Sequence, residues 1–68
     1  MVLRVIYSRH AVERMVLRGI SRVEVEAAIA SGSKSRQGGR IIAAYRYFEV
    51  AYVVRGSTII VITVKPRW

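Results

Sequence analysis

The chain has 68 residues, the length of one small domain, with no cysteine, no aspartate and a single histidine. This composition excludes disulfides and thiolate metal sites and argues against a zinc site built from several histidines, so we predict no metal and no cofactor. Twelve Lys and Arg against four Glu give a net charge of +8, and ten of the twelve cations are Arg. Such a chain is expected to bind a polyanion or an acidic protein.

Hydrophobic residues make up 53% of the chain, which excludes intrinsic disorder. The apolar stretches are short and interrupted by arginine, so none is expected to span a membrane. The N-terminus lacks the continuous apolar core and the small-residue cleavage site of a signal peptide. We therefore expect a cytoplasmic protein.

The N-terminal half predicts one strand followed by two helices. Residues 2–7 form a β-branched run of strand length. Ser8 is expected to cap a helix that ends at Gly19, because apolar residues recur behind it at helical spacing. An S-x-x-E capping box that begins at Ser21 predicts a second helix, which Gly32 ends.

The C-terminal half predicts a flexible loop and then strands. Residues 32–39 contain three glycines and no apolar residue, which is typical of a loop. Three strands are expected after it, at 40–48, 49–55 and 58–65. The first strand pair needs a turn near residues 46–47, and Pro66 is expected to end the last strand. The predicted fold is α+β, with two helices on one face of a three- to four-stranded antiparallel sheet and residues 2–7 as the optional edge strand.

Three basic side chains are expected to share one side of the first helix. His10, Arg14 and Arg18 are spaced four residues apart, which places them in one stripe. Ala11 and Met15 mark the apolar face that this stripe borders. At such a border a side chain is held by packing and still reaches a ligand.

Cleavage of RNA by its own 2′-hydroxyl requires a proton acceptor, a proton donor and cations around the phosphate. His10 is suited to proton transfer near neutral pH, and Arg14 and Arg18 are suited to hold the phosphate. The second proton-transfer group would come from the sheet. The side chains considered for it are Tyr45, Tyr47, Tyr52 and Lys65.

A wider set of residues is expected to contact nucleic acid. In the run Tyr45-Arg46-Tyr47 an arginine lies between two tyrosines, and this pattern fits base stacking. The predicted nucleic-acid contacts are Arg40, Tyr45, Arg46, Tyr47, Thr63 and Arg67. The alternative is structural: the tyrosines pack in the sheet, the arginines form a solvated helix face and His10 is an ordinary helix residue.

The motif residues resemble a known family. Ser8-Arg9-His10-Ala11, Arg14-Met15 and Arg18-Gly19-Ile20 are similar to the signature S-x-H-A-x-x-R-M-x-x-R-G-I of a small family of uncharacterised bacterial and archaeal domains. Residues 59–64 are similar to the final strand of that family. The family is allied to RelE-like and BrnT-like toxins, the wider group with barnase-like and colicin-type ribonucleases.

The resemblance implies one RelE/BrnT-like toxin-type domain over residues 1–68. It implies a metal-independent endoribonuclease that acts as the toxin of a toxin–antitoxin pair. His10 would be the acid/base residue, Arg14 and Arg18 would lie near the phosphate, and Thr63 and Lys65 would lie on the strand that lines the site.

Two other functions fit the same residues. One is an RNA- or DNA-binding module that uses the basic surface without catalysis. The other is an interaction domain whose positive charge meets an acidic antitoxin, or which pairs with a second copy of the chain. The sequence does not distinguish RNA from DNA.

Overall fold

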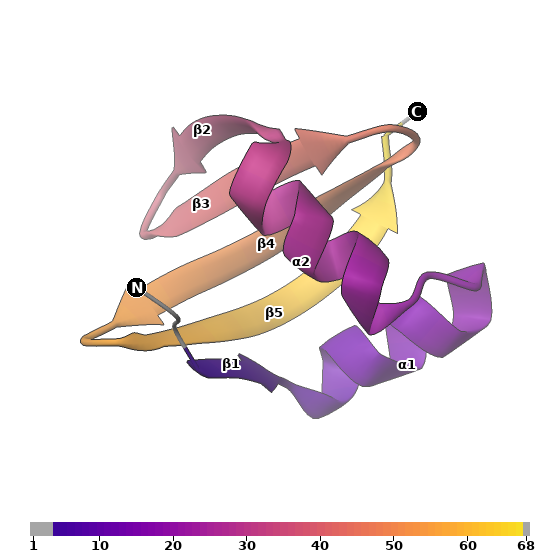
Figure 1. Ribbon diagram of the computed structural model, residues 1–68, viewed down its shortest axis with the longest axis horizontal. Coiled ribbons are helices and arrows are strands. Elements are labelled where there is room, and N and C mark those ends of the chain that lie inside the picture. Colours follow the sequence, from indigo (N-terminus) through magenta and orange to yellow (C-terminus); the bar gives the residue numbers. More distant parts are fainter. Residues whose placement is uncertain (1–3, 68) are drawn as a thin grey trace.

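The computed structural model describes residues 4–67 and shows a five-stranded sheet with both helices on one face (Figure 1). The elements in chain order are β1 (Arg4–Tyr7), α1 (Arg9–Arg18), α2 (Arg22–Ser31), β2 (Ser33–Gln37), β3 (Arg40–Tyr45), β4 (Phe48–Arg55) and β5 (Thr58–Pro66). The strand order is β1-β5-β4-β3-β2, so the N-terminal strand lies beside the C-terminal strand. Neither helix in this part of the chain has the length and apolar character needed to cross a bilayer.

The α+β class holds, but the predicted antiparallel sheet of three to four strands is wrong. The sheet is mixed, because β1 runs parallel to β5, with Arg4 opposite Thr58 and Tyr7 opposite Val61. Two helices separate β1 from the rest of the sheet, and such a crossover connection permits parallel pairing. Residues 2 and 3 of the predicted first strand lie outside the described part of the chain.

The predicted loop at residues 32–39 is also wrong, because it contains β2. This strand pairs antiparallel with β3, from Ser33 opposite Ala44 to Gln37 opposite Arg40. All five of its side chains are exposed, so its sequence carries no alternation of apolar and polar residues. The turn at Gly38, which has a φ of 63°, joins the two strands.

Both predicted helices are confirmed, and local capping chemistry explains their ends. The Ser8 hydroxyl accepts a hydrogen bond from the Ala11 amide at the start of α1, and Gly19 ends that helix with a φ of 69°. At the start of α2, Ser21 and Glu24 form the reciprocal capping box.

The core lies between the helices and the sheet face that they cover. α1 packs over β5 and α2 packs over β3 and β4. Fully buried apolar side chains fill the space between them, and the largest are Phe48, Val25, Val50, Val61 and Val64. Burial of these groups is the main source of stability in a chain with no disulfide.

Two irregularities shape the end of the sheet that carries the C-terminus. The β3–β4 turn falls at residues 46 and 47, as predicted, and Arg46 adopts a φ of 55° there without glycine. The register of β4 and β5 shifts between Ala51 and Tyr52, because Ile62 is an additional residue that forms a β-bulge in β5. β5 then continues to Pro66, which ends the strand as predicted.

Candidate active site

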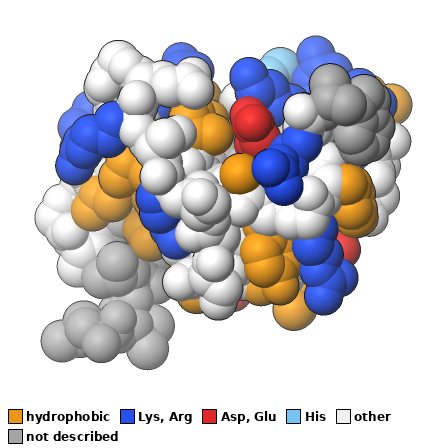
Figure 2. Space-filling view, turned by 90° about the horizontal axis from the view of Figure 1, so that it is seen from above, with side chains coloured by type: hydrophobic (Ala, Val, Ile, Leu, Met, Phe, Trp, Pro, Cys, Tyr) orange, Lys and Arg blue, Asp and Glu red, His pale blue; other side chains and the backbone are white. Residues whose placement is uncertain are grey.

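A pocket of about 320 Å³ lies between α1 and the final residues of β5. It is lined by His10, Arg14, Arg18, Thr63, Val64, Lys65 and Pro66, and we call it the cationic pocket. Figure 2 shows the histidine, in pale blue, beside blue Lys and Arg side chains. The structure thus brings together the four residues predicted as catalytic, His10, Arg14, Arg18 and Lys65, with Thr63 from the predicted binding set.

The topology explains why α1 meets this part of β5. β1 pairs only with Thr58–Val61, so among the described residues the remainder of β5 has no strand on that side. The chain leaves β1 at Tyr7 and enters α1 at once, which places the helix along this free edge. The cationic pocket is therefore at the edge of the sheet, next to α1.

Ser8 fixes the start of α1 against the bulge in β5. Its hydroxyl donates a hydrogen bond to the Ile62 carbonyl oxygen at 2.8 Å and accepts one from the Ala11 amide at 3.0 Å. Its amide donates to the Val61 carbonyl oxygen at 3.0 Å. Because His10 lies two residues after Ser8 and Thr63 lies next to Ile62, these bonds set both walls of the pocket.

The electrostatics of α1 favour an anion. No acidic residue occupies its first turn, so the positive end of the helix dipole is not neutralised there. The ion pairs within residues 4–67 are Arg9–Glu13, at 3.5 Å, and Lys65–Glu49, at 3.9 Å. Arg14 and Arg18 therefore form no ion pair with the described residues, and their guanidinium groups are available to a phosphate.

Four sheet residues are candidates for the second proton-transfer group. Of these four, Lys65 lines the cationic pocket. The register of β4 and β5 places it opposite Glu49, whose carboxylate holds its ammonium group. Tyr52 instead lies opposite Ile41 and is 5% exposed, and burial raises the pKa of its hydroxyl. Tyr45 and Tyr47 lie around the β3–β4 turn and do not line this pocket.

The remaining predicted contacts are distributed over the sheet. Arg40 lies at the opposite end of β3 from Tyr45, a separation of roughly 17 Å for five extended residues. Tyr45 packs edge to face on Phe48 and against the core, with the Arg46 guanidinium 5.3 Å from the centre of its ring. Arg67 donates a hydrogen bond from Nη1 to the Arg46 carbonyl oxygen at 2.9 Å.

Sequence reasoning missed three residues that shape the site. Ser8 was expected only as a helix cap, and its bond to Ile62 depends on contacts between distant parts of the chain. Ile62 forms the bulge, which no local motif indicates. Glu49 had one signal, because it is the only acidic residue in the predicted strands.

Comparison with known proteins shows the family of this chain and a solved structure of similar fold. Residues 7–65 match the family model described as a domain of unknown function, DUF4258. A chain in the crystal structure of the toxin-antitoxin complex RelBE2 from Mycobacterium tuberculosis is similar in fold, with a TM-score of 0.73 and 18% identity over 98% of this chain and 100% of that chain. No curated protein sequence matched. Because the family model covers most of its length, the chain belongs to the DUF4258 family.

Proposed function

We propose that residues 1–68 form one toxin-type domain that cleaves RNA, with the reacting phosphate in the cationic pocket. The observation that carries the proposal is the convergence of His10, Arg14 and Arg18 with Lys65 in one pocket, although Lys65 lies 47 positions after the end of the helix. The fold shared with a chain of a toxin-antitoxin complex supports the same assignment.

The reaction needs no group beyond those in the pocket. One proton-transfer group, His10, removes the proton from the 2′-hydroxyl, and the 2′-oxygen attacks the adjacent phosphorus. The bond from phosphorus to the 5′-oxygen then breaks, and Lys65 gives that oxygen a proton. The products are a 2′,3′-cyclic phosphate and a free 5′-hydroxyl. Arg14 and Arg18 stabilise the additional negative charge on the phosphoryl oxygens in the transition state.

The competing function is a nucleic-acid-binding module without catalysis. The same cations would then hold a phosphate, but His10 would have no chemical role. The two functions differ in their response to His10→Ala. Loss of cleavage with retained binding supports the enzyme, whereas unchanged behaviour supports the binding module.

The product ends provide the direct test of the proposed reaction. An RNA oligonucleotide labelled at its 5′ end is incubated with the protein in EDTA, and the fragments are analysed for a 2′,3′-cyclic phosphate. The same oligonucleotide with 2′-deoxyribose at the cleaved position is the matched control, because it keeps the phosphate and lacks the nucleophile. Cleavage of the control, or fragments that carry a 5′-phosphate, would contradict the mechanism.

An acidic protein partner is the second part of the proposal. A groove of about 340 Å³ between α1, the start of α2 and Tyr7 of β1 is lined by Val12, Met15 and Val16 together with the basic Arg22. Val16 is 78% exposed, and Val23, which follows Arg22 in α2, is 77% exposed. Exposed valines beside arginine on a chain of charge +8 suit an amphipathic, acidic segment, which is the chemistry expected of an antitoxin.

This partner is tested by co-expression with the acidic product of a neighbouring gene. Val16→Asp should abolish co-purification, because it places a negative charge against an acidic segment, and it should leave RNA cleavage intact. Retained co-purification would exclude this groove. A mass that rises with concentration in the absence of the neighbour would instead indicate pairing with a second copy.

A further inference from the structure

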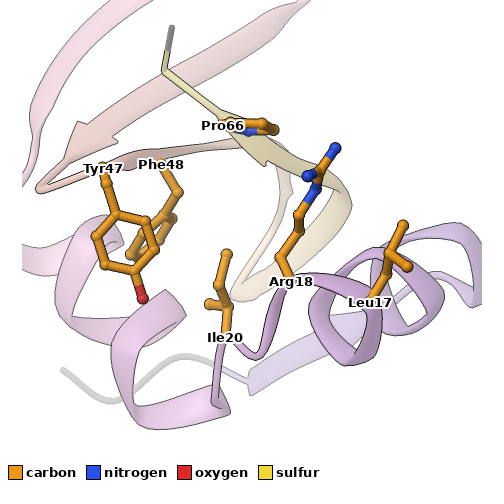
Figure 3. Close-up of a pocket in the computed structure, with 6 residues that line it drawn as sticks. All are labelled: Leu17, Arg18, Ile20, Tyr47, Phe48 and Pro66. Atoms are coloured by element: carbon orange, nitrogen blue, oxygen red, sulfur yellow. The ribbon is translucent and has the colours of Figure 1, made fainter.

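A second hollow lies next to the cationic pocket, and the proposed reaction does not use its apolar residues. It has a volume of about 290 Å³ and lies between α1, the β3–β4 turn and the end of β5 (Figure 3). The residues that line it are Leu17, Arg18, Ile20, Tyr47, Phe48 and Pro66, and we call it the aromatic pocket. Phe48 and Ile20 are buried, while Tyr47 is 44% exposed.

The two pockets are adjacent. Arg18 and Pro66 line both of them, so a ligand that reaches past these two side chains can contact both. Figure 3 shows the Arg18 side chain directed toward Pro66, with the ring of Tyr47 across the hollow from it. A ligand that spans the pockets would place its anionic group near His10 and its apolar part near Tyr47.

Tyr47 is held in place before any ligand arrives. Its ring packs edge to face on Phe48, with ring centroids 5.4 Å apart and an angle of 69°. Its hydroxyl donates to Glu24 Oε2 at 3.4 Å, and its carbonyl oxygen accepts from the Arg67 amide at 3.1 Å. A ring fixed in this way loses little conformational entropy on binding.

The position of Glu24 strengthens this arrangement. Its carboxylate accepts hydrogen bonds from the Ser21 amide at 2.9 Å and from the Ser21 hydroxyl at 3.2 Å. These bonds, with the Ser21 amide as the main cause, lower the pKa of Glu24, and the bond that its carboxylate accepts from the Tyr47 hydroxyl adds to this effect. The capping box of α2 thus fixes an aromatic side chain of the β3–β4 turn.

We infer that the aromatic pocket binds the nucleobase of the nucleotide whose phosphate occupies the cationic pocket. This inference rests on the proposed function. A volume of about 290 Å³ is at the small end of ligand pockets, so it suits one planar ring system. Aromatic walls beside a guanidinium group favour a base, because every base has a π-face that stacks on Tyr and on Arg.

The test is an NMR titration of the intact protein with four nucleoside 3′-monophosphates and, separately, with inorganic phosphate. Inorganic phosphate is expected to shift the amide signals of His10 and Lys65 only. The nucleotides are expected to shift those signals and also that of Tyr47, and to bind about 10-fold tighter than phosphate, within the range of base–aromatic stacking.

Two variants separate base binding from phosphate binding. Tyr47→Ala removes the stacking ring at a residue that is 44% exposed and does not line the cationic pocket, so the base loses its contact while the phosphate site is kept. It should reduce nucleotide affinity to that of inorganic phosphate. Tyr47→Phe keeps the ring but removes its bond to Glu24, so it should bind nucleotides more weakly than the native protein and more tightly than inorganic phosphate. Val54→Ala, at a residue of β4 that is also 44% exposed and does not line either pocket, is the control and should change neither affinity.

Failure of the inference and failure of the proposed function give different results. If nucleotides and inorganic phosphate bind equally and shift only the cationic pocket, the base site is wrong and the phosphate site stands. If inorganic phosphate causes no shift at His10 or Lys65, the phosphate site is wrong, and the base site that depends on it is overturned as well.

Discussion

The Ser8 hydroxyl lies 2.8 Å from the Ile62 carbonyl oxygen and joins the first turn of α1 to the bulge of β5. The same hydroxyl caps α1 through the Ala11 amide. One side chain thus sets the start of the helix that carries His10 relative to the strand that carries Lys65. This relationship gives the first prediction.

Ser8→Ala should reduce both stability and RNA cleavage. Loss of the cap should lower the free energy of unfolding by about 1 kcal/mol, and loss of the bond to Ile62 should move α1 relative to β5. The matched control is Ser21→Ala, which removes the corresponding cap of α2, at the Glu24 amide. Urea denaturation and cleavage rates are measured for both variants. Equal losses of cleavage in the two would show that Ser8 acts only through stability.

Arg14→Ala should weaken binding of single-stranded RNA and reduce its salt dependence. Removal of one phosphate contact reduces the magnitude of the negative slope of log K against log salt concentration by about 0.7, where K is the association constant. Arg55→Ala is the control, since it removes the same charge at the far end of β4, away from the cationic pocket. Binding isotherms at several salt concentrations give the slopes. The same slope in both variants would indicate that charge alone, and not this pocket, attracts RNA.

The fold should lose stability in alkali through Tyr7. Burial, together with the bond that its hydroxyl donates to Glu26, raises the pKa of Tyr7 to about 12. Above its usual value, near 10, the unfolded chain loses this proton before the folded chain does, so unfolding becomes easier as the pH rises toward 12. Tyr7→Phe should therefore lose less stability than the native protein between about pH 9 and about pH 11. The free energy of unfolding is measured by urea denaturation at each pH. If it declines equally in the native protein and in Tyr7→Phe, Tyr7 is excluded as the cause.

Gly32→Ala should destabilise the connection between α2 and β2. A Cβ atom at this position would lie 2.5 Å from the Ala28 carbonyl oxygen and 2.8 Å from that of Ala44, and neither backbone atom can move freely. We expect a loss of about 1–3 kcal/mol, typical of overpacking. Gly39→Ala is the control, because a Cβ there meets open space. Thermal melts should separate the two variants, and equal melting temperatures would contradict the crowding.

The elements that could be predicted from the sequence are those whose boundaries are set by residues close to them in the chain. Ser8 and Ser21 cap their own helices, and Gly19 ends one of them, so short motifs determine these boundaries. β2 has five exposed side chains, and it is a strand only because its backbone pairs with β3. The parallel pairing of β1 with β5 joins residues more than fifty positions apart, and no local pattern specifies it.

The same distinction applies to the site. Helical spacing was sufficient to place His10, Arg14 and Arg18 on one side of α1. That Lys65 joins them depends on where β1 stops pairing and on the bulge at Ile62, and both follow from the register of the whole sheet. The aromatic pocket depends on the β3–β4 turn, since it needs Tyr47 next to the end of β5.

The most direct test of the proposed ribonuclease is the rate at which the native protein and His10→Ala, purified side by side, cleave a labelled RNA oligonucleotide. We expect endonucleolytic cleavage by the native protein and a reduction of about 100-fold or more in the variant, the usual effect of losing a proton-transfer group. RNA binding by the variant should be retained. Equal rates, or intact RNA with both proteins under conditions in which both bind it, would contradict the central claim.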